Sequence, residues 1–430
     1  MSNAHDFLTR QVLDALAPWQ QERWAPVGEK LIAEYCWYPD WYFSPDRRKQ
    51  DAARPHVILI DGAPFHYLPA NAIEYNNWRV EPDGSLHRIP NRPNVHWEFV
   101  SRGFRGGLET VIADLRAGRL EDAAPVLGCL LHVLEDAGSV AHVLEGVDGT
   151  DVGVLDRLLR PPADQPDALP GLVLRRPDAV PFAWGDFRPA LLGANIREAV
   201  FRLYGPFCAM VRANRYELVP CIQDTWRGEE ARASACRSRM NRRMCAVAAS
   251  LMHTVACIAW ERFDPGDLEA LQSVALGDLE PIHRPYFLPG YEASPLVKDR
   301  SLGPKAERVP LRLSLPGGPR TFDQGIGTGC HAEYLLAFDL PADTYERFTA
   351  SVGLHADLGA RGAFGVEIRL GGRTLLQEHF NAEHPATTFD VATLEGGMLE
   401  LYVRDETGDW SNPNNHVVWG DPRLVRVRPP

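Results

Sequence analysis

The chain has 430 residues, of which 45% are hydrophobic, so it is long and apolar enough to bury the cores of two globular domains. Its formal net charge of −12 argues against charge-driven binding to nucleic acid or to anionic lipid. No apolar run is long enough to span a bilayer, and no apolar leader stands at the N-terminus, so the sequence as printed predicts a cytoplasmic protein. Secretion is expected only if the native N-terminus differs from MSNAH.

Three segments in the first hundred residues each offer one side chain of a metal-ligand type. His5 begins HDFLTRQVLDALAPW, in which apolar residues recur at helical spacing. Asp40 lies among aromatic residues in AEYCWYPDWYF, and its alternative interpretation is a surface turn. His96 lies in NVHWEFV, just before another helical pattern.

The segment LLHVLEDAGSVAH concentrates three more such side chains. A helical pattern runs from about Asp122 through Asp136, and residues four apart share a helix face, so the His132 imidazole and the Asp136 carboxylate can point at one ion. Gly138 predicts the end of this helix, after which the chain can turn and bring His142 back to the same centre. The alternative is that His132 is a core histidine with satisfied hydrogen bonds.

The order His, Asp, His, His-x3-Asp-x5-His resembles that of the zinc-dependent phospholipase C and S1/P1 nuclease superfamily, over roughly residues 5–263. The resemblance implies an all-helical fold with one to three zinc ions. The ligands that it implies are His5, Asp40, His96, His132, Asp136 and His142. It also implies that Asp136 bridges two metals, that Asp40 is both a ligand and the general base, and that Trp41 and Trp97 line the substrate pocket. The alternative for the two tryptophans is that both are ordinary core residues.

The sequence departs from this family at two ligand positions. It begins MSNAH, without the N-terminal tryptophan that secreted members use as a ligand, and no His-x3-Glu segment follows His142. The acidic residues available in its place are Glu145, Asp148, Asp151 and Asp156. These departures keep open the alternative of a non-catalytic protein whose helical domain has a degenerate metal site.

Other polar residues of the helical region predict structural roles. Arg237, Arg239, Arg242 and Arg243 are expected to form a solvated helix face, and His253, within an apolar helix pattern, to make a buried hydrogen bond. The eight cysteines include no C-x2-C pair, and the pattern does not specify any disulfide.

The character of the sequence changes after residue 265. A Pro-rich connector, predicted at 266–284, leads to seven or eight short segments of alternating apolar and polar residues, which predict a β-sandwich. GIGT and the terminal pattern of His416, Trp419 and Asp421 resemble the NPCBM family, a galactose-binding-like jelly roll proposed to bind carbohydrate, over about residues 285–430. Trp410, Asn414 and Trp419 are the candidates for sugar contact, and the alternative is that they only join strands.

The sequence therefore predicts a multidomain α + β protein with a phospholipase C/P1 nuclease-like helical domain at 1–265, a linker at 266–284 and a jelly roll at 285–430. The predicted activity is zinc-dependent hydrolysis of a phosphodiester, in a phospholipid or a glycoconjugate, assisted by glycan binding at the C-terminal domain. A single-strand nuclease of the same superfamily and a non-catalytic carbohydrate-binding protein are the alternatives. No stable complex with nucleic acid is expected.

Overall fold

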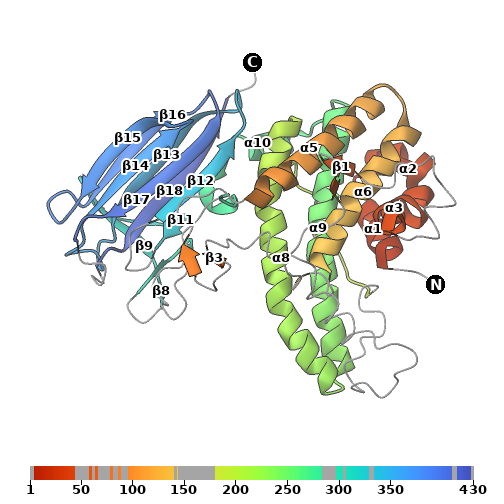
Figure 1. Ribbon diagram of the computed structural model, residues 1–430, viewed down its shortest axis with the longest axis horizontal. Coiled ribbons are helices and arrows are strands. Elements are labelled where there is room, and N and C mark those ends of the chain that lie inside the picture. Colours follow the sequence, from red (N-terminus) through yellow and green to blue (C-terminus); the bar gives the residue numbers. More distant parts are fainter. Residues whose placement is uncertain are drawn as a thin grey trace. The chain divides into compact units, whose positions relative to one another are not determined.

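The protein is described from a computed structural model, which shows two compact units (Figure 1). The first unit comprises Met1–Glu74 and His96–Leu268, and the second comprises Tyr75–Val95 and Glu269–Pro430. The structure describes residues 4–43, 58–60, 63–65, 78–80, 86–88, 95–139, 143, 180–282, 297–303, 307–328, 334–408 and 414–427.

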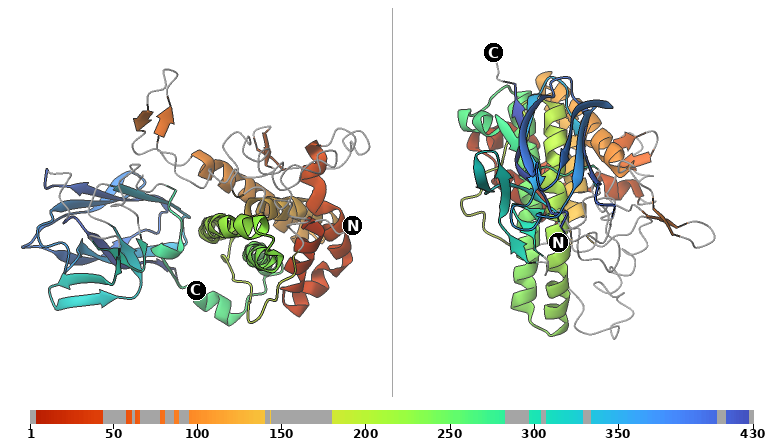
Figure 2. Two further views of the ribbon diagram at one scale, coloured as in Figure 1. Left: turned by 90° about the horizontal axis from the view of Figure 1, so that it is seen from below. Right: turned by 90° about the vertical axis from the view of Figure 1, so that its left-hand side faces the viewer.

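Helices form most of the described part of the first unit. They are α1 (Ala4–Asp14), α2 (Pro18–Ala33), the short 3-10 helix η1 (Tyr35–Trp37), α3 (Tyr38–Phe43), α5 (Val95–Arg116), α6 (Leu120–Gly138), α8 (Ile196–Trp226), α9 (Glu230–Ala259) and α10 (Pro265–Ala270). The long helices α8 and α9 lie side by side, as both views in Figure 2 show. None of the described helices combines the length and the apolar character needed to cross a bilayer.

Two helix segments are buried on every side and form the centre of this unit. All residues of α6 from Leu127 to Gly138 are buried, and so are all residues of α9 from Val247 to Ala259. A helix that is buried all round usually carries apolar residues throughout. Titratable side chains within these two segments therefore need partners, because an uncompensated charge in an apolar core is costly.

The helix predicted through Asp136 is present as α6, and it ends at Gly138. The sequence predicted that Gly138 ends the helix as a cap, but Gly138 does not have a positive φ and is therefore not a left-handed cap. A Cβ at this position would instead lie 2.7 Å from the sulfur of Met210 and 2.8 Å from that of Met244. Gly138 thus permits close packing against α8 and α9.

The region predicted to be entirely helical also contains two short antiparallel hairpins. Strands β1 (Ile58–Ile60) and β2 (Ala63–Phe65) form the first, and β3 (Trp78–Val80) and β4 (Leu86–Arg88) form the second. The second hairpin falls within the residues that belong to the second unit. Three-residue strands carry too little alternation to be recognised from sequence.

The second unit is a β-sandwich, as predicted. Its strands are β5 (Ser273–Ala275), β6 (Val297–Lys298), β7 (Ser301–Leu302), β8 (Arg308–Val309), β9 (Leu311–Leu315), β10 (Gly318–Phe322), β11 (Gly325–Gly327), β12 (Tyr334–Leu340), β13 (Tyr345–Leu354), β14 (Phe364–Leu370), β15 (Arg373–Phe380), β16 (Ala386–Ala392), β17 (Gly397–Asp405) and β18 (Val417–Arg426). One sheet has the order β16-β13-β18-β11-β6, with β5 also paired to β18, and the other has the order β12-β17-β14-β15. Strand β5 and the 3-10 helix η3 (Leu276–Asp278) fall within the residues predicted as a connector.

Alternation of buried and outward-facing residues explains how these strands enclose a core. In β17, Leu399, Leu401 and Val403 are buried and the residues between them are partly exposed, which is the period expected of a sheet with one covered face. Large rings from both sheets, including Phe348 of β13 and Phe364 of β14, fill the space between the sheets.

Candidate metal centre

Four of the six predicted metal ligands lie close together in the helical unit. His5 lies in the first turn of α1, Asp40 lies on α3, and His132 and Asp136 lie one turn apart on α6. The ligand-type atoms of His5, His132 and Asp136 all lie within 4.8 Å of one another. The i, i+4 spacing on α6 places two of the groups locally, and helix packing adds the other two.

The Asp136 carboxylate faces both imidazoles. Its Oδ2 is 3.0 Å from Nε2 of His132, and its Oδ1 is 3.5 Å from Nε2 of His5. Asp40 repeats this arrangement at a longer distance, with Oδ1 at 3.9 Å from Nε2 of His132 and Oδ2 at 4.0 Å from Nε2 of His5. Each carboxylate thus offers one oxygen to each imidazole.

The other ring nitrogen of each histidine is held by an acceptor. Nδ1 of His132 lies 2.7 Å from the carbonyl oxygen of Cys36, and Nδ1 of His5 lies 2.6 Å from Oε2 of Glu135. A carbonyl oxygen can only accept, so Nδ1 of His132 carries the hydrogen. Metal-binding histidines usually donate their second N–H to a carbonyl or a carboxylate in this way, which fixes the ring and directs Nε2 at the ion.

Glu135 is a further residue of this cluster, and the sequence analysis did not identify it. It is fully buried, and its Oε1 accepts a hydrogen bond of 2.8 Å from Oγ1 of Thr9. Thr9 follows His5 by four residues, so both partners of Glu135 lie on one face of α1. The signal that could have revealed Glu135 is a glutamate within the apolar run of α6, where a carboxylate without partners would be costly.

A glycine on α6 allows the Cys36 carbonyl to reach His132. A Cβ on Gly128 would lie 2.6 Å from the carbonyl carbon of Tyr35, in the adjacent 3-10 helix η1. Gly128 precedes His132 by four residues and therefore lies on the same face of α6. The absence of a side chain at Gly128 permits the close approach that positions the His132 ring.

The cluster is enclosed on most sides and open at Asp40. The His5 and His132 rings stack with their centroids 4.4 Å apart, and Trp37 meets His5 edge-on at 4.6 Å. The side chain of His132 has no exposed surface, and that of Asp136 is 7% exposed, whereas that of Asp40 is 42% exposed. Solvent or a ligand would therefore meet the cluster at Asp40.

The charges in the cluster affect the titration of His132. Burial lowers the pKa of His132, but the charge of Asp136 and its hydrogen bond outweigh burial and raise this pKa to about 9, with smaller contributions from Asp40 and the Cys36 carbonyl. In the absence of a metal ion the His132 imidazole therefore holds a proton at neutral pH, and its positive charge faces the carboxylates.

These donors fit a zinc-type ion. Zn–N and Zn–O bonds of about 2.1 Å in a tetrahedron separate neighbouring ligand atoms by about 3.4 Å. Each imidazole lies near this distance from its own oxygen of Asp136, His132 at 3.0 Å from Oδ2 and His5 at 3.5 Å from Oδ1, and the separations to Asp40 are about 0.5 Å longer than this value. Two neutral imidazoles and two carboxylates would also balance the charge of a divalent cation.

The remaining residues predicted for this site are described only in part. His96 and Trp97 lie in the first turn of α5, where the structure describes the backbone and not these side chains, and His142 lies outside the described residues. Trp41 is partly buried, next to Asp40 on α3, and its ring lies 5.7 Å from that of Tyr38.

In the sandwich, the residues predicted to contact sugar occupy different environments. Trp419 is fully buried and donates a hydrogen bond of 3.0 Å from Nε1 to the hydroxyl of Tyr334. Its ring is a core residue between the sheets and has no surface on which a sugar could stack. Asn414 is partly buried at the start of the last segment, and Trp410 lies outside the described residues.

Of the four arginines of α9 that were predicted to form a solvated face, Arg239 and Arg242 are exposed and Arg243 is partly exposed, whereas Arg237 is buried. The side chain of Arg237 is only 3% exposed and pairs with Glu230 at 2.5 Å. Arg239 and Arg243 both pair with Glu217 on α8. The prediction was wrong for Arg237 alone, because charge periodicity does not reveal which side chains another helix covers.

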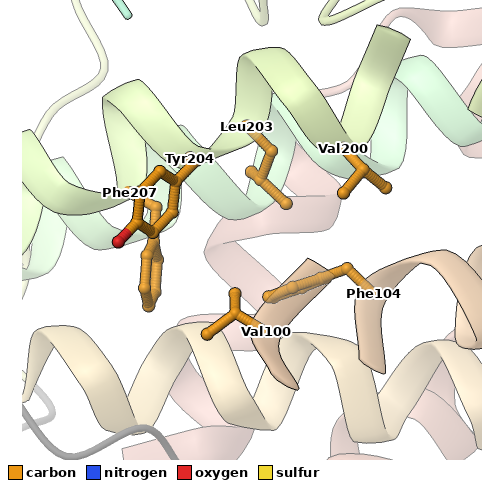
Figure 3. Close-up of a pocket in the computed structure, with 6 residues that line it drawn as sticks. All are labelled: Val100, Phe104, Val200, Leu203, Tyr204 and Phe207. Atoms are coloured by element: carbon orange, nitrogen blue, oxygen red, sulfur yellow. The ribbon is translucent and has the colours of Figure 1, made fainter. Parts of the chain in front are cut away.

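A small apolar pocket between α5 and α8 does not coincide with the metal-ligand cluster. Figure 3 shows Val100 and Phe104 of α5 opposite Tyr204, Phe207 and two smaller residues of α8. None of the described residues that line this pocket carries a charge.

Similarity to other proteins is found among solved structures and not among curated proteins. A comparison with curated proteins finds no match. Among solved structures, the CBM51 of Clostridium perfringens GH95, in complex with methyl-galactose, is 21% identical over 36% of this chain and 99% of that chain, with a TM-score of 0.30. The alpha toxin of Clostridium absonum is 11% identical over 100% of this chain and 95% of that one, with a TM-score of 0.35. The alpha-toxin of an avian strain of Clostridium perfringens is 9% identical, over 99% and 98%, with a TM-score of 0.35.

The family comparison concerns the second unit. The family model of the NPCBM/NEW2 domain matches residues 274–425, which include β5 through most of β18. The predicted resemblance of the C-terminal sandwich to the NPCBM family is therefore confirmed.

Proposed function

We propose that the protein is a zinc-dependent phosphodiester hydrolase whose ions are held by His5, Asp40, His132 and Asp136. The observation that supports it best is the orientation of the two histidines: each Nδ1 is held by an acceptor, and each Nε2 faces a different oxygen of the buried Asp136 carboxylate. When bound there, zinc would activate a water molecule and offset negative charge on the phosphate oxygens.

The side chains have distinct roles in this proposal. Asp136 faces both imidazoles and would be the ligand shared by two ions if two were bound. Asp40 is the general base, since it is a ligand with an exposed carboxylate that can accept a proton at the open side. Glu135 and the Cys36 carbonyl orient the histidines. His96 and His142 remain the proposed further ligands, and Trp41 and Trp97 the proposed pocket residues.

The substrate that we propose is a phospholipid or a phosphodiester within a glycoconjugate. The net charge of −12 disfavours a polyanionic substrate such as nucleic acid, whose binding is dominated by phosphate contacts to basic side chains. The NPCBM match suggests that the sandwich binds a glycan and so brings the helical unit to a glycosylated substrate. The sugar contacts that we propose are Trp410 and Asn414.

The metal content of the full chain tests this proposal first. Protein purified without chelator is expected to contain one to three zinc ions per chain by elemental analysis, and Asp136→Ala is expected to lose at least one. The matched control is Asp224→Ala, which removes a buried aspartate of α8 whose nearest basic partner is Arg232 at 3.6 Å. Zinc-free wild-type protein, or equal zinc in both variants, would contradict the proposal.

Two substrates then separate the reaction classes. The zinc-loaded protein is given phosphatidylcholine vesicles, to detect phosphocholine, and single-stranded DNA, to detect nucleotides. If phosphocholine is released by the wild-type protein and not by Asp136→Ala, the result supports the phospholipase hypothesis. Release of nucleotides alone would establish the nuclease, and binding on a glycan array without any hydrolysis would leave a carbohydrate-binding protein.

A further inference from the structure

One end of the α8–α9 hairpin is basic, although the chain as a whole is acidic. Residues 212–243, here called the basic hairpin end, span the second half of α8, the turn after it and the first half of α9. They contain eight arginines and four acidic residues, an excess of four positive charges in a chain with a formal net charge of −12. The net charge disfavours charge-driven binding over the surface in general, but a local basic region can still attract an anionic partner.

Arginines of the same hairpin already pair with the four acidic side chains. The ion pairs are Glu217 with Arg239 and Arg243, Asp224 and Glu229 with Arg232, and Glu230 with Arg237. The acidic groups are thus compensated within the hairpin. An anionic surface that approaches the basic hairpin end would therefore meet the excess positive charge.

The basic hairpin end also carries two exposed apolar side chains. Among the described residues, the exposed large apolar side chains are Tyr216 at 80%, Val219 at 57% and Leu394, in the sandwich, at 46%. A single exposed apolar residue is common on protein surfaces. Tyr216 and Val219, however, lie three positions apart on α8 and therefore share one face of the helix.

The same face of α8 carries an arginine on either side of these two residues. Positions 212, 216, 219, 223 and 227 recur at intervals of three or four, so they form one stripe along the helix, here called the α8 stripe. Arg212 is partly buried, whereas Gln223 and Arg227 are exposed like Tyr216 and Val219. The stripe thus combines aromatic, aliphatic and cationic side chains on one outward face.

This combination fits the surface of a phospholipid bilayer. A tyrosine is suited to the interface, because its ring is apolar and its hydroxyl group is polar. Arginines on a helix that lies in the interface are attracted to anionic headgroups, while apolar side chains on the helix enter the boundary of the acyl chains. A nucleic acid would also attract the arginines, but Val219 favours a lipid, since acyl chains would remove its exposed surface from water.

We propose that the α8 stripe is a docking surface for phospholipid bilayers that contain anionic lipid. The helix lies on the bilayer, with Tyr216 and Val219 at the headgroup boundary and Arg227 at the lipid phosphates. This inference rests on the proposed function and deepens it, because it makes lipid within a bilayer, and not a soluble phosphodiester, the form in which the substrate is met.

Vesicle binding by the full chain tests the docking surface without requiring hydrolysis. Sucrose-loaded vesicles of phosphatidylcholine and phosphatidylserine are sedimented with the protein in the presence of EDTA. Wild type is expected to sediment with the vesicles, and to do so less at high salt. Tyr216→Gln combined with Val219→Gln should weaken binding at least about ten-fold, because the apolar contact is lost. Arg227→Gln should weaken it about five-fold, as expected for one basic side chain near an anionic surface.

The matched control is Leu394→Gln, which alters the exposed apolar residue of the sandwich and should bind vesicles as wild type does. The α8 variants are expected to fold, because both side chains are exposed and glutamine is a good helix former. Unchanged circular dichroism and thermal unfolding would verify this.

Three results would overturn the docking surface. They are the absence of wild-type protein from the vesicle pellet, equal binding by wild type and the double variant, and binding of single-stranded DNA in place of vesicles. The outcome is separable from that of the proposed function, because EDTA removes metal from the protein. A chain without zinc or hydrolysis can bind vesicles through the stripe, and a zinc-dependent hydrolase can fail to do so.

Discussion

Buried histidines in the two units differ in what their ring nitrogens face. In the helical unit, His132 has Nδ1 on the carbonyl of Cys36 and Nε2 facing the Asp136 carboxylate. In the sandwich, His355 donates from Nε2 to the carbonyl of Pro310 at 2.9 Å and accepts at Nδ1 from the N–H of Asp357 at 3.1 Å. Neither residue is more than 2% exposed, so burial does not separate them.

The difference shows how a ligand can be told from a structural histidine. Backbone groups on both nitrogens leave His355 no lone pair for an ion, and its pKa is lowered because burial disfavours the charged ring. His132 has the opposite shift, because carboxylates outweigh the same burial. The buried histidine of the helical unit therefore belongs to a cluster of charged groups, whereas His355 of the sandwich joins segments of backbone.

The largest effect is expected at Trp419, which tests the structural side of this comparison. Trp419→Ala removes a buried ring and its hydrogen bond to Tyr334, and it should lower the free energy of unfolding by about 3–5 kcal/mol. Urea denaturation measures this change. Unchanged stability combined with lost glycan binding would instead return Trp419 to the sugar-binding role.

Gly128→Ala tests the packing that positions His132. The new methyl group would meet the backbone of Tyr35, so we expect a loss of about 1–3 kcal/mol in unfolding free energy together with weaker zinc binding. Gly106→Ala is the control, because a Cβ there has no neighbour within 4 Å and alanine should favour α5 by up to about 1 kcal/mol. Equal stabilities for the two variants would argue against the close approach.

Glu135→Gln sharpens the comparison by weakening the partner of His5 without removing a proposed ligand. Loss of the carboxylate that holds Nδ1 should reduce zinc affinity about 10–100-fold, measured by competition with a chromophoric chelator. Glu198→Gln is the control, since this buried glutamate instead bonds the backbone near the start of α8. Equal zinc affinity in both variants would exclude an orienting role for Glu135.

The smallest effect is a pH dependence that arises from His355. Burial lowers its folded-state pKa below the ordinary 6.5, so the folded state binds fewer protons than the unfolded state. The stability from neutral His355 is therefore fully present above about pH 6.5 and is lost as the pH falls below it. Urea midpoints between pH 8 and pH 5 should fall less in His355→Gln than in wild type, with the exposed His384→Gln as the control. A steeper fall in His355→Gln would contradict this sign.

The spacing of residues along the sequence predicted those parts of the site that lie within one helix. The i, i+4 pair of His132 and Asp136 follows from helix geometry, and the position of α6 could be predicted from its apolar residues. The proximity of His5 and Asp40 was inferred only from resemblance, because it depends on how α1 and α3 pack against α6. Glu135 was missed for the same reason, since its partners lie 130 and 126 residues away.

Fold prediction had the same limit. The sandwich was recognised because long strands such as β17 alternate over many residues, whereas the three-residue strands β1 to β4 and the pairing of β5 with β18 carry no comparable signal. Arg237 is buried and interacts with Cys221 of the neighbouring helix α8, which charge spacing along α9 does not reveal.

The position of His5 at the start of α1 gives the proposed ion a mechanical role. His5 and Glu135 are 130 residues apart, so an ion held by His5 and α6 would act as a cross-link that closes a very long loop of chain. Such closures restrict the unfolded chain most when the loop is long. Removal of the ion would release α1 from α6, and α1 would then become more accessible to proteases.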